Sequence, residues 1–285
     1  MRIGLVGYGG WGRVHASAIG RVEGLSLGGV VAGDDASARQ AAHDLPGVPL
    51  HRTLDALLVD PGVDLVDIVG PNHLHADMAV KALAAGKHVL LEKPMATTLA
   101  DSERLVAAAE RSDRHCGIVL QLRVSRQWAR VRELIAEGAL GRMRFANLTL
   151  FRRPFRGGAG DWRTTRDTVG SWILEEPIHY IDLLLWYFRE GGLPVEVSAS
   201  GLASPLGPGM SDAFTATMTF ADGSHAVFTQ CLAGFEHSLR LELAGTRYSG
   251  SGPMASALAM DKELSKQLFR PADVRTADWL MVRAG

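Results

Sequence analysis

Residues 3–12, IGLVGYGGWG, place a short apolar run directly before a G-x-G-x-x-G pattern. The pattern begins at Gly7, includes Gly9 and ends at Gly12, and a helical stretch follows from about Arg13. Glycines allow a tight turn and a close approach to a pyrophosphate, whose charge is attracted by the free N–H groups of a helix N-terminus. The position between strand and helix therefore predicts a dinucleotide-binding turn. A purely structural glycine turn is the alternative.

The alternation of strand and helix continues over the first 120 residues. Further apolar runs predict strands at residues 27–32, 64–69, 88–91 and 117–120. Helical patterns lie between them at residues 36–43, 53–59, 73–85 and 100–111. Strands that alternate with helices in this way are typical of a parallel sheet covered on both faces. We therefore expect an α/β protein whose residues 1–120 form a Rossmann domain with a doubly wound parallel sheet.

The pattern changes after about residue 120. Residues 125–137 predict a helix with one apolar face. Alternating patterns typical of strands follow at residues 214–220, 226–231 and 239–243. The pair Asp222-Gly223 separates the first two of these and indicates a hairpin. We expect residues 121–285 to form an α+β domain with a mostly antiparallel sheet. The family resemblance described below implies that this domain binds substrate and mediates oligomerisation.

Composition limits the possible partners. The chain has 47% hydrophobic and 21% charged residues, as an ordinary globular protein does. Its 30 basic and 31 acidic residues nearly cancel, so charge gives no reason to expect a nucleic-acid or anionic-membrane partner. No secretory signal pattern or run of about eighteen apolar residues is present, so we expect a cytoplasmic protein. Cys116 and Cys231 predict two buried thiols, with one long-range bridge as the alternative.

An acidic residue near the end of the second strand usually binds the ribose hydroxyls of adenosine. Asp34 stands 22 residues after Gly12 and fits this spacing. Asp34 and Asp35 would repel the 2′-phosphate of NADP, whereas Arg39 could accept it. The balance favours NAD slightly. A helix N-cap is an equal alternative for the two aspartates.

Polar residues also follow the third and fourth predicted strands, at the sheet edge where doubly wound proteins bind ligands. Residues 71–98 read PNHLHADMAVKALAAGKHVLLEKPMATT. This stretch resembles the hallmark segment of the Gfo/Idh/MocA oxidoreductases, the family of glucose–fructose oxidoreductase and inositol dehydrogenase. The resemblance also covers the glycine pattern and a segment around His179, and so spans roughly residues 1–190.

The resemblance implies that Lys93 of Glu92-Lys93-Pro94 is the catalytic proton carrier. A lysine with its ordinary pKa of about 10.4 would be too fully protonated to accept the proton of an alcohol. Burial and the neighbouring nicotinamide cation would lower that pKa. Glu92 would oppose the shift if it faced Lys93, but adjacent strand residues point to opposite sides. The alternative for Glu92 and Lys93 is a solvated surface pair.

The resemblance assigns four further residues to the cofactor: Pro71, Asn72, His75 and Glu92. Asn72 and His75 would lie near the nicotinamide ribose. The alternatives are a helix N-cap for Asn72 and an ordinary first-turn histidine for His75.

A third block comprises Trp162-Arg163 and residues 170–182, GSWILEEPIHYID. By resemblance, His179 relays or orients the substrate proton, Glu175 stands where the family has aspartate, and Pro177 where it has glycine. Arg163 would touch cofactor or substrate, and Asp182 matches a later family aspartate. The spacing of Glu175 and His179 predicts one shared helix face, with Pro177 tolerated in the first turn. A helix start with capping acids and a core histidine is the alternative.

Together these features predict an NAD(P)-dependent oxidoreductase that acts on a sugar, inositol or related polyol or ketone. Lys93, His179 and Glu175 are the expected catalytic residues, and Lys93 and His179 must converge beside the nicotinamide. The family's assembly through a sheet face implies a homo-oligomer, a dimer or a tetramer.

Two other functions use the same residues. The spacings of His73 with His75 and of Glu175 with His179 would suit a metal-dependent hydrolase. A non-catalytic NAD(P)-binding regulator would use the same scaffold without turnover. A loop with three arginines could meet an anionic substrate, although a solvated basic loop is the simpler interpretation; it contains Arg152, Arg153 and Arg156.

Overall fold

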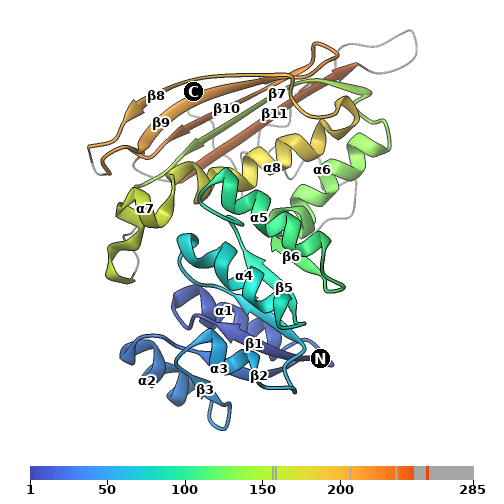
Figure 1. Cartoon of the computed structure of the whole chain (residues 1–285). Helices are drawn as coiled ribbons and strands as arrows, with labels where there is room; N and C mark the ends of the chain where they lie inside the picture. Colours follow the sequence, from blue (N-terminus) through green and yellow to red (C-terminus); the bar gives the residue numbers. More distant parts are fainter. Residues whose placement is uncertain (156, 158, 206, 235–236, 247–254, 257–285) are drawn as a thin grey trace, which may run out of the picture. The chain divides into compact units, whose positions relative to one another are not determined.

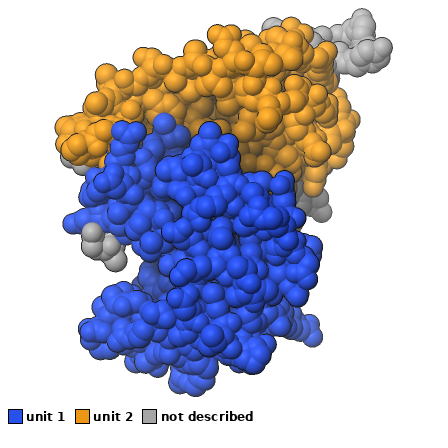
Figure 2. All heavy atoms as spheres, viewed as in Figure 1, with its two compact units in different colours: residues 1–120, 156–178 blue, residues 121–155, 179–285 orange. Residues whose placement is uncertain are grey.

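A computed structural model describes residues 1–155, 157, 159–205, 207–234, 237–246 and 255–256. Arg156 of the basic loop lies outside the described residues, as does nearly all of the segment from Tyr248 onward. The chain divides into two compact units, coloured in Figure 2. One comprises residues 1–120 and 156–178, and the other residues 121–155 and 179–285. The chain thus leaves the first unit after residue 120, returns to it at residue 156 and leaves it again after residue 178.

The first unit contains a six-stranded parallel sheet in the order β3-β2-β1-β4-β5-β6 (Figure 1). Its strands are β1 (Arg2–Val6), β2 (Ser26–Val31), β3 (Leu50–His51), β4 (Leu65–Ile68), β5 (His88–Glu92) and β6 (Cys116–Val119). The strand order reverses direction between β1 and β4, which confirms the predicted doubly wound sheet. The sequence patterns did not predict β3, which has two residues.

Helices follow the strands of this sheet. They are α1 (Gly10–Ile19), α2 (Asp35–Asp44), α3 (Leu54–Leu58), α4 (His75–Ala84), α5 (Leu99–Glu110) and the short α7 (Arg166–Val169). Three 3-10 turns add to them: η1 (Asn72–Leu74), η3 (Ala159–Thr164) and η4 (Trp172–Leu174). Thr53 and Thr98 cap α3 and α5, because each side chain accepts a backbone N–H of the first turn.

Both faces of the parallel sheet are buried. Leu5 packs with residues of α1 and α2, whereas its neighbour Val6 packs with residues of α3, α4 and α5. Val30 and Val31 divide between the same two clusters. Adjacent strand residues point to opposite faces, so each strand contributes to both cores. This is why the strands read as continuous apolar runs.

The second unit contains a six-stranded sheet in the order β12-β11-β7-β10-β9-β8. Its strands are β7 (Arg142–Phe151), β8 (Glu196–Ala203), β9 (Ser211–Thr219), β10 (His225–Cys231), β11 (Ser238–Thr246) and β12 (Ala255–Ser256). Among the described strands of this second sheet, only β7 and β10 pair in parallel, which confirms a mostly antiparallel sheet. The predicted hairpin is the β9–β10 pair, in which Thr219 lies opposite His225.

Two helices belong mainly to this second unit, α6 (Arg126–Ala136) and α8 (Pro177–Tyr187). Aromatic rings join them to the sheet: Tyr180 lies 6.1 Å from Trp128 and 6.2 Å from Phe228, measured between ring centroids. The Tyr187 hydroxyl donates to the Trp128 carbonyl at 3.1 Å. The shorter turns are η2 (Gln121–Val124) and η5 (Arg189–Gly191).

Two further expectations concern the whole chain. Cys116 and Cys231 are both free and half-buried, so the bridge alternative is wrong. Across the described parts of the chain, every helix is too short or too polar to cross a membrane.

Candidate active site

The glycine turn joins β1 to α1, as the sequence predicts. Gly7 has a φ of +97°, and a Cβ added there would lie 2.6 Å from the Val69 carbonyl oxygen. A Cβ on Gly12 would run into the carbonyl oxygen of Gly7. A Cβ on Gly9 or Gly10, in contrast, would meet nothing within 4 Å. Gly7 and Gly12 are thus required by the chain's own packing, whereas the space beside Gly9 is open to a ligand.

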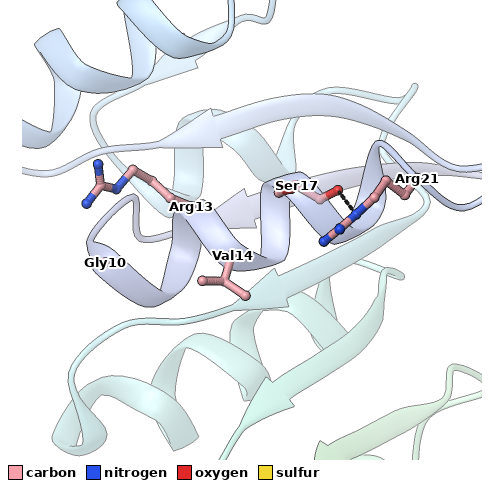
Figure 3. Close-up of a pocket in the computed structure, with 5 residues that line it drawn as sticks. All are labelled: Gly10, Arg13, Val14, Ser17 and Arg21. Atoms are coloured by element: carbon pink, nitrogen blue, oxygen red, sulfur yellow. Dashed lines mark hydrogen bonds between the residues drawn. The ribbon is translucent and has the colours of Figure 1, made fainter. Parts of the chain in front are cut away.

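Helix α1 begins at Gly10, and its N-cap Gly9 has no side chain that could occupy the first backbone N–H groups. These groups are available to a phosphate. A hollow of about 380 Å³ runs along the same helix and is lined by Gly10, Arg13, Val14, Ser17 and Arg21 (Figure 3). In Figure 3 the Arg13 side chain extends toward the Gly10 end of the helix. The turn therefore has a positive charge beside it.

The acidic pair after β2 caps helix α2. Asp34 accepts the backbone N–H of Ser37 at 2.9 Å, and this hydrogen bonding lowers the pKa of Asp34. Asp35 forms an exposed ion pair with Arg52 at 2.7 Å. Asp34 is thus the N-cap of α2, as the alternative interpretation predicts. Its binding of the ribose stays a prediction.

Lys93 follows the last residue of β5. Its amine donates to the main-chain carbonyl of Glu175, which comes from the returning segment 156–178. Burial lowers the pKa of Lys93, and the carboxylates of Glu175 and Glu92 only partly offset that effect. The direction of this shift is the one a proton acceptor needs. Since Glu92 is only 4% exposed, the surface-pair alternative for Glu92 and Lys93 is wrong.

Glu175 binds two side chains in the same unit. Its Oε1 accepts from Asn72 Nδ2 at 2.9 Å, and its Oε2 accepts from Arg163 Nε at 2.6 Å. Burial would raise the pKa of Glu175, but the charges of Lys93 and Arg163 and these hydrogen bonds lower it. Asn72 also donates to the Val169 carbonyl at 3.1 Å. The arrangement joins Asn72, Lys93, Arg163 and Glu175, four of the predicted site residues.

Arg163 is held from two further directions. Its guanidinium carbon lies 4.4 Å from the ring centroid of Trp162, and its carbonyl accepts the indole N–H of Trp172 at 2.8 Å. The Arg163 side chain is still 34% exposed. It is therefore a fixed cation that solvent, and hence a ligand, can reach.

The prediction that Glu175 and His179 share one helix face is wrong. Helix α8 begins at Pro177, so Glu175 lies before it, at the end of η4. Proline has no N–H and suits a first helical position, but it disfavours helical backbone in the residue before it. The expected place of Pro177 in the first turn is confirmed.

His179 lies on α8, is 7% exposed and belongs to the second unit, whereas Lys93 belongs to the first. Three residues further along the helix, Asp182 accepts from Arg123 Nε at 2.7 Å within the second unit. The convergence of His179 with Lys93 stays a prediction.

His75 contacts the main chain with both ring nitrogens. Nδ1 lies 2.6 Å from the Pro94 carbonyl and Nε2 lies 2.9 Å from the Gly70 carbonyl. Burial outweighs these contacts and lowers the pKa of His75, so the ring is neutral at pH 7 and can donate to only one of the two. The ring braces the loop after Lys93 against the loop that holds Pro71, the N-cap of η1. The contact of Pro71 and His75 with a cofactor stays a prediction.

Glu92 belongs to a polar cluster with three further side chains, Trp11, His15 and Asp67, that were not among the predicted site residues. Glu92 Oε1 accepts from Trp11 Nε1 at 2.8 Å and lies 3.2 Å from His15 Nε2. His15 Nδ1 lies 2.9 Å from Asp67 Oδ2. The sequence contains a signal for this cluster, because Asp67 interrupts an otherwise apolar strand and Trp11 and His15 are four residues apart on one helix.

A doubly wound parallel sheet with a glycine turn after β1, an exposed helix N-terminus and a half-buried lysine after β5 defines a dinucleotide-binding protein of the Rossmann type. Residues 1–119 match the model of an oxidoreductase family with an NAD-binding Rossmann fold. Residues 128–249 match the model of the GFO/IDH/MocA C-terminal domain. The chain belongs to the Gfo/Idh/MocA oxidoreductase family.

Two curated relatives agree with this, and a solved structure shares the fold. A 1,5-anhydro-D-fructose reductase from Ensifer adhaerens is 32% identical over 76% of this chain and 67% of that protein. A scyllo-inositol 2-dehydrogenase (NADP(+)) from Bacillus subtilis (strain 168) is 26% identical over 77% of this chain and 60% of that protein. The structure of GenD2 from gentamicin A biosynthesis, in complex with NAD, superposes with a TM-score of 0.80 at 24% identity, over 91% of this chain and 72% of that one. Among similar curated proteins, the chain spans from 34% to 70% of the relative's length.

Proposed function

We propose that the protein is an NAD(P)-dependent dehydrogenase or reductase that interconverts an alcohol and a ketone on a sugar, an inositol or a related polyol. The supporting observation is the environment of Lys93. A lysine with a lowered pKa follows β5, two strands from the glycine turn of β1 in the sheet. Its amine donates to the main-chain carbonyl of Glu175, whose side chain binds Asn72 and Arg163. Family membership supports the reaction class, and the substrates of two relatives, the anhydrofructose reductase and the scyllo-inositol dehydrogenase, support the substrate class.

Lys93 is the proton carrier in this proposal. In the oxidation, the substrate O–H proton passes to the neutral amine of Lys93 while the hydrogen on the same carbon leaves as hydride, and the C–O bond becomes a carbonyl. The nicotinamide ring supplies the hydride acceptor. In the reverse direction, protonated Lys93 returns the proton to the developing alkoxide. The main-chain carbonyl of Glu175 holds the amine in place in either state.

Glu175 has a positioning role. Both of its oxygens are used by Asn72 and Arg163, so its carboxylate fixes these two side chains rather than a substrate hydroxyl. Arg163, fixed and partly exposed, would then bind an oxygen of substrate or cofactor. His179 would assist from the second unit by orienting the reacting hydroxyl.

The preferred dinucleotide in this proposal is NAD. Asp34 and Asp35 both stand at the N-terminus of α2, and the pKa of Asp34 is lowered, so the place that a 2′-phosphate would take has negative charge. Arg52 neutralises Asp35, although both side chains are more than half exposed. Arg39 offers a competing cation, and the expected preference is therefore modest.

The test combines turnover with binding. The purified protein is assayed with NAD and NADP against a panel of polyols, inositols and sugar ketones, and dinucleotide affinity is measured in parallel by fluorescence. Turnover on a panel member, with a higher kcat/KM for NAD, is expected. Tight dinucleotide binding without turnover on any panel member would instead support a regulator. Turnover that a chelator abolishes would support the metal-dependent alternative, which the two main-chain contacts of His75 disfavour.

A further inference from the structure

Four side chains form a polar cluster between α1 and the strands β4 and β5. Two carboxylates face it, Asp67 at 1% and Glu92 at 4% exposure. His15 lies between them, with Nδ1 at 2.9 Å from Asp67 and Nε2 at 3.2 Å from Glu92. Trp11 adds its indole N–H to Glu92. The proposed proton transfer involves none of these side chains.

The geometry of the cluster fixes how many protons it holds. Each ring nitrogen of His15 faces a carboxylate oxygen, and each of these contacts needs one proton. A neutral imidazole has one N–H, so both contacts exist only while the ring is an imidazolium or a carboxyl shares its proton. The other oxygen of Asp67 has no hydrogen-bond partner among the described residues, so Asp67 depends on His15 for its compensation. Burial would lower the pKa of His15, but the hydrogen bonds to Asp67 and Glu92 outweigh it and raise that pKa to about 9.

The same cluster connects two parts of the proposed site. Trp11 and His15 lie on one face of α1, just after the turn that would bind the pyrophosphate. Glu92 precedes Lys93 and accepts its main-chain N–H at 3.1 Å on the second carboxylate oxygen. The link from the turn to the lysine thus passes through three hydrogen bonds to a single glutamate.

We propose that His15 is a positioning residue, whose bridge between Asp67 and Glu92 holds the dinucleotide-binding end of α1 against the strand end that bears Lys93. The inference rests on the proposed function. The two contacts of His15 need two protons, one on each ring nitrogen or shared with a carboxyl. The proposal implies that dinucleotide affinity falls when pH rises and one of these two protons is lost. The charged groups that act on His15 are Asp67 from β4 and Glu92 from β5, and Lys93 acts on Glu92 in turn.

The experiment measures two quantities between pH 6 and pH 10.5. The protonation of His15 is followed by NMR of its ring C–H signals in the dinucleotide-free protein, and the affinity for the reduced dinucleotide is followed by fluorescence. The affinity titration is repeated with Lys93→Ala, which removes the titration of Lys93 as a cause. His115→Gln is the matched control, because His115 is an exposed histidine of the same unit.

Asp67→Asn is the decisive variant. The amide of the new side chain can donate to Nδ1 of a neutral ring whose Nε2–H donates to Glu92, so the bridge survives without the second proton. We expect wild-type affinity to fall about tenfold through pH 9, and Asp67→Asn to keep its affinity across that range. His15→Gln should bind the dinucleotide about tenfold more weakly already at pH 7, whereas His115→Gln should match the wild type.

An unchanged alkaline loss of affinity in Asp67→Asn would overturn the proposal, as would wild-type affinity in His15→Gln. So would a His15 ring that titrates near 6.5, the ordinary value for histidine. The NMR measurement needs no dinucleotide. A protein with the bridged, high-pKa histidine but without dinucleotide binding would therefore refute the proposed function and not the bridge.

Discussion

Glu92 and Glu175 both accept a hydrogen bond from Lys93, and they differ in the other groups that they bind. They are similarly buried, at 4% and 5% exposure, and hydrogen bonds and positive charges lower the pKa of each despite burial. Glu92 binds Trp11 and His15 of α1, on the side of the glycine turn. Glu175 binds Asn72 of η1 and Arg163 of η3. One kind of side chain thus positions a cofactor-binding helix on one side and a set of ligand-facing groups on the other.

The difference indicates how one lysine can serve two binding events. The backbone N–H of Lys93 donates to the Glu92 carboxylate, and its amine donates to the main-chain carbonyl of Glu175. A change at Glu92 should alter dinucleotide affinity, and a change at Glu175 should alter the chemical step. The predictions below separate these two effects.

Removal of the amine should have the largest effect. Lys93→Ala is expected to lower turnover at least about a hundredfold, the usual scale for a lost acid–base group, and to leave dinucleotide affinity nearly intact. Steady-state kinetics and fluorescence titration on the same preparation measure the two quantities. Turnover close to that of the wild type would remove Lys93 from the mechanism.

The two glutamate-to-glutamine variants test the comparison directly. In either one the amide NH₂ must face a donor that the carboxylate accepted, so one hydrogen bond is lost. Glu175→Gln should lower kcat by about ten- to a hundredfold with little change in dinucleotide affinity. Glu92→Gln should weaken dinucleotide binding about tenfold and change kcat by less than about threefold at saturation. If both variants changed kcat and dinucleotide affinity equally, the groups bound by Glu92 and by Glu175 would not have separate roles.

The pH profile sharpens the same contrast. Oxidation needs neutral Lys93, so kcat/KM for the alcohol should rise with pH through the lowered pKa of Lys93 to a plateau, and the reduction should show the opposite trend. Glu175 raises that pKa more than Glu92 does. The rise should therefore move to lower pH in Glu175→Gln, and move less in Glu92→Gln. A midpoint that stays in place in both variants would show that neither carboxylate acts on the amine.

The smallest effect is expected from Trp11→Phe. Phenylalanine keeps an aromatic ring beside His15, whose centroid lies 6.0 Å away, but it cannot donate to Glu92. Since the Trp11 side chain is partly exposed, water can replace the lost donor, and dinucleotide affinity should fall about threefold with kcat unchanged. Isothermal titration resolves a change of this size. A change in kcat without a change in dinucleotide affinity would show that Trp11 acts on the chemical step, as we expect of Glu175, and not on cofactor binding.

Much of the fold could be predicted because the parallel strands are buried on both faces and so read as apolar runs. Two strands of the second unit show where this fails. Every residue of β8 is exposed, and its sequence, EVSASGLA, consists mostly of small residues, so its alternation is too weak to indicate a strand. In β7 the buried positions change phase near Phe145, which disrupts the period of two.

The candidate site was predicted in part, through family resemblance rather than through spacing. Asn72, Lys93, Arg163 and Glu175 are brought together as that resemblance suggests, although Glu175 lies outside the helix where its spacing from His179 had placed it. Local patterns single out members of the cluster around His15, such as Asp67 in an apolar strand, but they do not show that these members meet, because they come from α1, β4 and β5. Only the strand pairing along the sheet brings such distant segments together.

The return of residues 156–178 to the first unit has a consequence for how the protein can be made and divided. A fragment that ends at residue 120 would contain the whole parallel sheet and the glycine turn, but Asn72 and Lys93 would lack the segment that binds them. During synthesis, the lysine end of the sheet stays incomplete until Glu175 has left the ribosome. An isolated N-terminal fragment should accordingly be a binder of dinucleotides with no capacity for turnover, and grafting residues 156–178 back onto it would be the way to restore the ordered site.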